Sequence, residues 1–400
     1  MKKFLVILLL VLFPFCISAE ELGPVEEGDN IEVVKEITDG GLASNAKSAI
    51  LIDASTGEVI YEKNPHEKLA PASMTKMMSM LLILESIENK VINWDDVITV
   101  SENASGMGGS QILLETNEKM TVKDLFKGVA VASGNDAVVA LAEATYGSTD
   151  VFVEEMNKKA KELGLKDTNF KNVHGLDTEN HYSSAYDMAL IARELSKHKK
   201  IFEFTSIYED YLRKGTDREF WLTNTNKLVR FYNGVDGFKT GFTPEAGYCL
   251  TATIEKNGMR LISVIMGEPS SKIRNAETTS LLNYGFAQMK SVNLIKKEQV
   301  VTEVELPKSE KINIEVVPKE DVSIIMKKTE KIGKITYDVE IDDININTKI
   351  GDKVGNLIVL EDNKKIKTID LTIKDKIKKA SILTLYKRYL ENMITGNISF

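Results

Sequence analysis

The chain has 400 residues, of which 43% are hydrophobic and 28% charged, as is typical of a folded protein, and its length favours two or three domains. The formal net charge is −8 and no long basic stripe occurs, so composition argues against nucleic acid as a partner.

The N-terminus is predicted to be a secretory signal peptide, residues 1–19. Two lysines precede an apolar run over residues 4–15, which is short for a membrane span, and Ala19 ends a small-residue stretch before an acidic segment. Cleavage is expected after Ala19, which would change the formal charge from −8 to −10. Cys16 could indicate lipoprotein processing instead, but the bulky Phe15 before it argues against that.

An α+β region is predicted to follow an acidic leader over residues 20–46. A strand over 48–53 leads into a turn at Gly57. Four helices are predicted over residues 74–88, 121–132, 135–146 and 151–163. Further along, Asn257-Gly258 lies between β-rich arms and predicts a hairpin. Cys249, the one cysteine left after cleavage, lies in an apolar run, where core packing is the simplest role and no internal disulfide is possible.

The last hundred residues have a different character. Alternating apolar and polar residues over 299–372 predict a small all-β domain. Residues 381–394 then form an amphipathic helical pattern, preceded by a basic stretch over 376–379. A basic amphipathic helix after a secreted β-domain favours a membrane-surface anchor, although a helix docked on the β-domain would give the same pattern.

The stretch PASMTKMM, residues 71–78, places Ser73 three residues before Lys76 at the start of an apolar helix. Residues i and i+3 share a helix face, so the lysine would lie beside the hydroxyl. A lysine in an apolar setting has a lowered pKa and can take the serine's proton, which makes the serine a nucleophile. A helix-capping serine beside a solvated lysine is the alternative. The same spacing recurs in the leader and in a charged run, at Ser44/Lys47 and Ser196/Lys199.

A second polar stretch, Ser133-Gly134-Asn135, breaks one predicted helix and starts the next. A loop between two helices can present a hydroxyl and an amide to a cleft. Helix capping by Ser133 or Asn135 is the alternative. The pattern is weak alone, since it recurs at Ser101-Glu102-Asn103 and Ser291-Val292-Asn293.

A third stretch, Lys239-Thr240-Gly241, lies on a strand-like run. Lys239 and Thr240 could hold a carboxylate, and Gly241 would leave room for a substrate backbone to pair along the strand. The alternative is an edge strand protected by its lysine.

The three stretches in this order, SxxK, SxN and KTG, are the signature set of penicillin-binding proteins and class A β-lactamases. Their surroundings sharpen the resemblance, as in "STGEVIYEKNPHEKLAPASMTKMM", "VASGNDA", "HGLDTENHYSSAYDMA" and "NGVDGFKTGFTPEAGYCL". Residues 46–295 closely resemble the low-molecular-mass penicillin-binding proteins, the D-alanyl-D-alanine carboxypeptidases of peptidase family S11. The β-rich part and terminal helix resemble, more loosely, the second domain and membrane anchor of that family.

The resemblance implies a role for each matching residue. Ser73 would be the acyl-enzyme nucleophile and Lys76 its base. Ser133 would relay protons to the leaving amine, supported electrostatically by Lys239, and Asn135 would hydrogen-bond the substrate peptide. Thr240, with Thr243, would bind the terminal carboxylate beside Gly241, and the backbone N–H groups of Ser73 and Phe242 would form the oxyanion hole. Some relatives carry histidine at the position of Phe242, which leaves any histidine contribution to substrate binding in doubt.

The implied organisation is a signal peptide (1–19), a leader (20–46), a serine-type transpeptidase-like catalytic domain (47–295), a small β-rich domain (296–373) and a membrane-anchor helix (374–400). The implied partners are peptidoglycan stem peptides ending in D-Ala-D-Ala, β-lactam antibiotics and a membrane surface, with no metal or other cofactor. The four histidines show no zinc pattern, and His174, His181 and Asp177 are expected to organise a loop. The expected location is the outer face of the cytoplasmic membrane or the cell wall space.

Three rival interpretations use the same motifs. A β-lactamase would carry a Glu-x-x-Leu-Asn stretch past the second motif, and the corresponding LKDTNFKNVHGLD has no glutamate. A non-enzymatic penicillin-binding module has no residue-level support, because all three motifs are intact. A D,D-endopeptidase or weak transpeptidase shares the acyl-enzyme and stays open.

Overall fold

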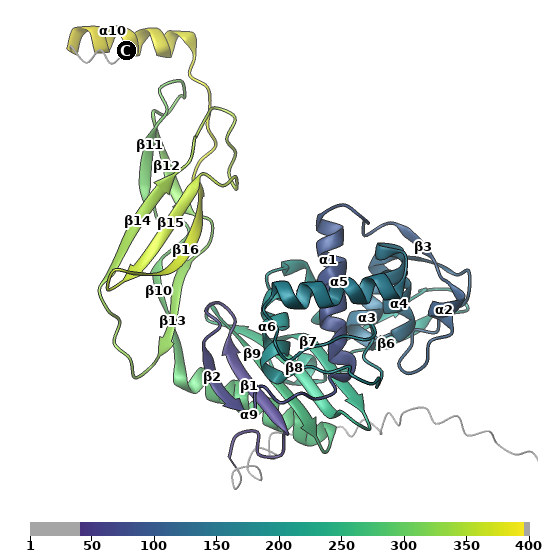
Figure 1. Cartoon of the computed structure of the whole chain (residues 1–400). Coiled ribbons are helices and arrows are strands. Elements are labelled where there is room, and N and C mark those ends of the chain that lie inside the picture. The colour runs from purple at the N-terminus through teal and green to yellow at the C-terminus, as the bar shows by residue number, and fades with distance from the viewer. Residues whose placement is uncertain (1–40, 396–400) are drawn as a thin grey trace, which may run out of the picture.

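The computed structural model describes residues 41–395 and has two parts (Figure 1). A cluster of helices packed on a sheet comes first along the chain, and an elongated β-rich part leads away from it to the terminal helix α10. The predicted signal peptide and all but residues 41–46 of the predicted leader lie outside the described residues. The predicted α+β fold class is confirmed.

The first part is built on an antiparallel sheet with strand order β2-β1-β9-β8-β7. The bounds are β1 Ser48–Asp53, β2 Val59–Lys63, β7 Val235–Thr243, β8 Gly247–Lys256 and β9 Met259–Glu268. Asn257 and Gly258 join β8 to β9 with φ of 53° and 73°, which confirms the predicted hairpin. Since β7 ends the sheet, one of its two edges is not paired with another strand of the described residues.

Helices cover both faces of this sheet. Helix α6 (Ala185–Leu195) packs on one face and α9 (Ser271–Gln288) on the other. Successive side chains of β1 therefore enter different cores: Ile50 and Ile52 pack with the helix cluster, and Leu51 packs with residues of α9. Cys249 is fully buried among the helix-cluster core, as predicted.

The four predicted helices are present. They are α1 Lys76–Glu88, α3 Val122–Ala132, α4 Asn135–Tyr146 and α5 Thr149–Glu162. Helix α1 is apolar on nearly all sides and lies at the centre of the cluster, as a helix without a polar face must. Two predicted starts were wrong: a 3-10 turn, η2 (Ala72–Thr75), precedes α1, and α5 begins two residues early because Ser148 caps it through the N–H of Val151.

Short elements complete the first part. They are β3 Val97–Thr99, α2 Glu102–Ser105, β4 Lys119–Thr121, η3 Lys199–Ile201, α7 Phe202–Thr205, β5 Glu209–Leu212, β6 Phe220–Thr223 and α8 Leu228–Phe231. The hairpin of β5 and β6 lies beside α3 and matters for the site below.

The second part has its own apolar core and two antiparallel sheets. Strand β10 pairs with β13, and the larger sheet has the order β11-β12-β16-β15-β14. The bounds are β10 Met289–Ile295, β11 Thr302–Glu305, β12 Asn313–Pro318, β13 Val322–Lys327, β14 Ile335–Ile341, β15 Gly355–Glu361 and β16 Lys364–Ile373.

Helix α10 (Ile382–Thr395) confirms the predicted terminal helix and lies at the far end of the β-rich part (Figure 1). Arg388 ties it to that part by donating to the backbone carbonyls of Pro307, Ser309 and Glu310. Within residues 41–395, no helix is both long and apolar enough to span a bilayer.

Candidate active site

Ser73 and Lys76 are in direct contact. Ser73 lies inside the 3-10 turn η2, where side chains three residues apart eclipse one another, and Lys76 is the first residue of α1. The Lys76 Nζ lies 2.8 Å from the Ser73 Oγ and donates to the carbonyl of His174, also at 2.8 Å. Ser73 is partly exposed, whereas Lys76 is completely buried. The capping interpretation is wrong, because Ser73 is not the N-cap residue of either helix.

The surroundings of Lys76 favour its neutral form. Burial lowers its pKa well below 10.5, and the nearby Lys239 cation lowers it further, while Asp136 partly offsets both effects. The neighbouring His174 is neutral at ordinary pH, since burial and, to a lesser degree, the proximity of Lys76 bring its pKa to about 4. A buried amine with a depressed pKa can hold a proton-accepting lone pair beside a hydroxyl.

Two glycines let neighbouring segments press against the Ser73 turn. A Cβ on Gly175, which has a φ of +94°, would lie 1.9 Å from the Ala72 carbonyl oxygen. A Cβ on Gly241 would lie 2.9 Å from the Pro71 carbonyl oxygen and 3.0 Å from the Ala72 Cβ. The absent side chain of Gly241 therefore makes room for the turn that carries Ser73, a reason that the sequence did not indicate; room for a substrate backbone stays a prediction.

Ser133 and Asn135 present unpaired polar atoms. Ser133 ends α3 in the left-handed conformation, with a φ of 65°, and its Oγ is buried without a hydrogen-bond partner in the described part of the chain. The Asn135 Nδ2 donates to the Gly108 carbonyl at 2.7 Å, which leaves the buried Oδ1 without a partner among residues 41–395. Ser133 is the C-cap residue of α3, but neither side chain makes a capping hydrogen bond, and the N-cap residue of α4 is Gly134, so N-capping by Ser133 or Asn135 is wrong.

The third motif lies on the edge strand β7. Lys239 is 1% exposed and donates to the Thr240 carbonyl at 3.1 Å. Burial, together with the Arg274 charge, lowers its pKa to about 7. β7 is an edge strand, as the alternative expected, but Lys239 is turned inward and is not exposed along that edge. Strand β7 is in direct contact with the 3-10 turn that carries Ser73. Lys239 is therefore close enough to Lys76 for its charge to lower the pKa of Lys76.

The hydroxyl groups of Thr240 and Thr243 have different hydrogen-bond partners. The Thr240 Oγ1 donates to the Thr225 Oγ1 at 2.7 Å, whereas Thr243 donates to an Asp177 carboxylate oxygen at 2.7 Å and accepts from the Ala246 N–H. Phe242, between them, is 42% exposed. Asp177 thus links its loop to β7, and its role as the organiser of that loop stays a prediction. Sequence reasoning missed Thr225, and only its place in the family-like NTNKL stretch could have indicated it.

The rival serine–lysine pairs lack this geometry. The Ser44 hydroxyl donates to Glu277, and the Ser196 hydroxyl to the Arg193 carbonyl. The rival match to the second motif also differs, because Ser101 caps α2 by accepting the Ala104 N–H. Among residues 41–395 no group of three His, Cys, Asp or Glu side chains lies close enough to hold a metal ion. The arrangement at Ser73 suits nucleophilic attack with proton transfer through buried groups.

Comparison with known proteins agrees with this chemistry. The profile of the D-alanyl-D-alanine carboxypeptidase family, peptidase S11, matches residues 35–270, and that of the penicillin-binding protein 5 C-terminal domain matches residues 290–379. The chain is 50% identical to the D-alanyl-D-alanine carboxypeptidase DacF of Bacillus subtilis over 87% of this chain and 90% of that protein.

Two solved structures are also similar. Penicillin-binding protein 5 from Haemophilus influenzae superposes with a TM-score of 0.64 at 32% identity, covering 86% of this chain and all of that one. Penicillin-binding protein D2 from Listeria monocytogenes in the ampicillin-bound form gives a TM-score of 0.55 at 32% identity, covering 60% of this chain and 98% of that one.

Proposed function

This chain belongs to the peptidase S11 family of D-alanyl-D-alanine carboxypeptidases, and from that premise we propose that Ser73 removes the terminal D-alanine of peptidoglycan stem peptides through an acyl-enzyme. The observation that carries the proposal is the buried Lys76 amine 2.8 Å from the Ser73 hydroxyl. The division into a catalytic domain, a β-rich domain and an anchor region is part of the proposal, but the first boundary lies before β10 and not at 295/296, because β10 (Met289–Ile295) pairs with β13 of the β-rich part.

In the acylation step, Lys76 takes the Ser73 proton as the Ser73 Oγ attacks the penultimate D-Ala carbonyl. The backbone N–H groups of Ser73 and Phe242 stabilise the oxyanion. The C–N bond then breaks, the leaving D-alanine amine receives a proton through Ser133, and the acyl group stays on Ser73. Water later attacks the ester, which releases the shortened peptide and returns the proton to Ser73.

The other motif residues bind and orient the peptide. The unpartnered Oδ1 of Asn135 accepts a substrate amide N–H, since its Nδ2 is already used by Gly108. Thr240 and the adjacent Lys239 bind the terminal carboxylate; the Thr240 hydroxyl can turn to it from Thr225. Thr243 is the weaker candidate, because its proton is donated to Asp177. A β-lactam acylates Ser73 in place of the peptide.

The test of this function is release of free D-alanine from diacetyl-Lys-D-Ala-D-Ala by the purified protein without residues 1–19. We expect release that benzylpenicillin blocks. A matched peptide with an amidated C-terminus lacks the carboxylate for Thr240 and Lys239 and should be a much poorer substrate. No release from the free-acid peptide would contradict the proposed reaction, and equal release from both peptides would contradict the carboxylate site.

We further propose that the protein is exported and that α10 holds it at the outer face of the cytoplasmic membrane. The apolar side chains of α10 are exposed, with Leu383 at 78% and Ile394 at 85%, and a lysine-rich stretch over 376–379 precedes the helix. Exposed apolar surface beside basic residues suits an anionic bilayer surface. The docked-helix alternative is weaker, because the contacts to the β-rich part come from the polar side through Arg388.

Binding to phosphatidylglycerol-containing vesicles tests the anchor. Leu383→Asp, on the apolar side, should abolish co-sedimentation, whereas Thr384→Asp adds the same charge to the polar side and should leave most of it. Equal binding by both variants would contradict the assignment of the apolar face.

A further inference from the structure

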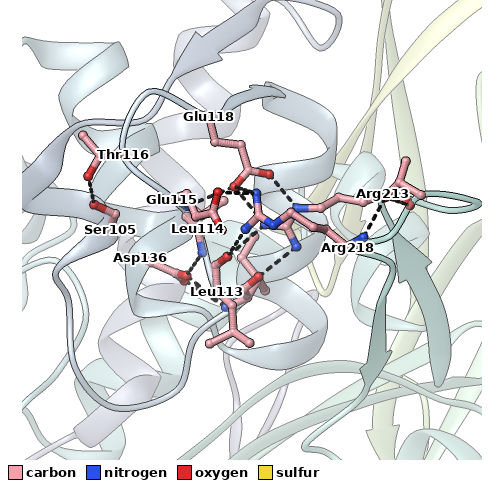
Figure 2. Close-up of polar contacts among 11 residues, drawn as sticks. Ser105, Leu113, Leu114, Glu115, Thr116, Glu118, Asp136, Arg213 and Arg218 are labelled. Atoms are coloured by element: carbon pink, nitrogen blue, oxygen red, sulfur yellow. Dashed lines mark hydrogen bonds and ion pairs between the residues drawn. The ribbon is translucent and has the colours of Figure 1, made fainter.

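The segment over residues 107–118 has almost no regular structure, yet its backbone is bonded from two sides (Figure 2). It connects α2 to β4 and passes next to Asn135, whose own N–H donates to the Ser110 carbonyl at 2.7 Å. A Cβ on Gly109 would lie 2.6 Å from the Asn135 Nδ2, so the segment and the asparagine are in close contact.

On one side, the Asp136 carboxylate accepts hydrogen bonds from two backbone N–H groups of the segment. This carboxylate, 1% exposed, accepts the Ile112 N–H at 3.0 Å and the Leu114 N–H at 3.0 Å, as well as the Ala137 N–H in its own helix at 2.8 Å. Figure 2 shows Asp136 beside the backbone of the segment. Asp136 lies directly after Asn135 at the start of α4, so the segment is bonded to the residue next to the motif.

On the other side, two arginines of the β5–β6 hairpin donate hydrogen bonds to backbone carbonyl groups of the segment. Arg213 donates to the carbonyls of Ile112 at 3.1 Å and Leu113 at 3.2 Å, and Arg218 donates to Leu113 at 2.9 Å. Both arginines also pair with Glu118, at the end of the segment, and the Arg213 and Glu118 side chains are only 10% and 11% exposed. Figure 2 shows these contacts converging on the segment.

The backbone of the segment requires such support. Leu113 has a φ of +55°, a conformation that is strained for leucine and persists only where the surroundings determine it. Around this residue, Asp136 holds the amide groups of Ile112 and Leu114, and the arginines hold the carbonyl groups of Ile112 and Leu113 that lie between them. The segment therefore keeps one shape, and with it the position of the Gly108 carbonyl that fixes the Asn135 amide.

We propose that Asp136, Arg213 and Arg218 are positioning residues, which act through segment 107–118 to hold the Asn135 side chain with its Oδ1 toward the substrate. The inference rests on the substrate-binding role of Asn135 proposed above. Among residues 41–395, neither arginine forms a hydrogen bond or ion pair with Ser73 or Asn135, so we assign their effect on the reaction to the backbone of the segment.

The test is a double-mutant cycle on kcat/KM for diacetyl-Lys-D-Ala-D-Ala. Arg213→Ala should lower kcat/KM by about 10- to 100-fold, because small misplacements of a binding group are costly to rate. Arg213→Lys keeps the charge opposite Glu118 but lacks the guanidinium fork, so its kcat/KM should be intermediate. Adding Arg213→Ala to Asn135→Ala should cost less than about twofold more, because both act through one group.

The matched control is Lys159→Ala, which removes a part-buried ion pair with Glu85 from the same helix cluster, away from the segment. It should lower the melting temperature about as much as Arg213→Ala and leave kcat/KM unchanged. Two outcomes would overturn this inference and leave the proposed role of Asn135 intact. In the first, Asn135→Ala lowers kcat/KM and Arg213→Ala does not. In the second, the two losses are additive in the double variant. Full activity of Asn135→Ala would overturn the proposed role of Asn135 and the inference with it.

Discussion

Replacement of Ser73 by alanine is expected to abolish both D-alanine release and labelling by a fluorescent penicillin. The Ser73 Oγ is the atom placed against the buried Lys76 amine, and no acyl-enzyme can form without it. We expect a loss of about 10⁴-fold or more, as for the removal of other serine nucleophiles. The measurement is the rate of penicillin labelling alongside the D-alanine assay.

Ser79→Ala is the matched control for this substitution. Ser79 lies in α1, two turns beyond Ser73, is buried, and donates to the Val173 carbonyl at 2.7 Å. Its loss should cost some stability and leave labelling intact. Labelling that survives in Ser73→Ala would mean that another residue is the nucleophile.

Replacement of Lys76 by methionine is expected to slow acylation by about 10²- to 10⁴-fold, the usual contribution of a general base. Methionine fills the apolar space with a side chain of similar length and carries no proton-accepting amine. We expect the Ser73 hydroxyl to remain in place, so the loss should appear in the acylation rate, measured as the rate of penicillin labelling.

The pH dependence of the same rate distinguishes a base from a structural lysine. Wild-type acylation should rise as Lys76 loses its proton, at a pH well below 10.5, because burial and the Lys239 charge lower its pKa more than Asp136 raises it. His174, with a pKa of about 4, stays neutral over this rise. The rise should be absent from Lys76→Met. An unchanged pH profile in the variant would show that another group accepts the proton.

Local sequence patterns predicted the turns and helix starts that depend only on neighbouring residues. The Asn257-Gly258 hairpin follows from the φ preferences of those two residues, and α3 begins at Val122 because the hydroxyl of Thr121, its N-cap residue, accepts the Asp124 N–H. The three motifs were found by their order along the chain. The spacing of Ser73 and Lys76 predicted their contact, although a 3-10 turn rather than an α-helix brings it about.

The rest depends on contacts between segments far apart in the chain. Gly175 and Gly241 are required by the close approach of other segments to the Ser73 turn, which no local pattern reveals. Thr225 reaches Thr240 from a separate loop. Arg213 bonds the carbonyls of residues a hundred positions earlier, so its role could not be read from its own surroundings in the sequence.

The central claim is that Ser73 is the residue that becomes acylated, and mass spectrometry of the benzylpenicillin adduct tests it most directly. Trypsin cleavage after Lys68 and Lys76 yields the peptide LAPASMTK, residues 69–76, which holds Ser73 and one other hydroxyl, Thr75. Our account predicts a single penicilloyl group on this peptide, with fragment ions that place it on Ser73. An adduct on Thr75 or on another peptide, or no adduct at all, would contradict it.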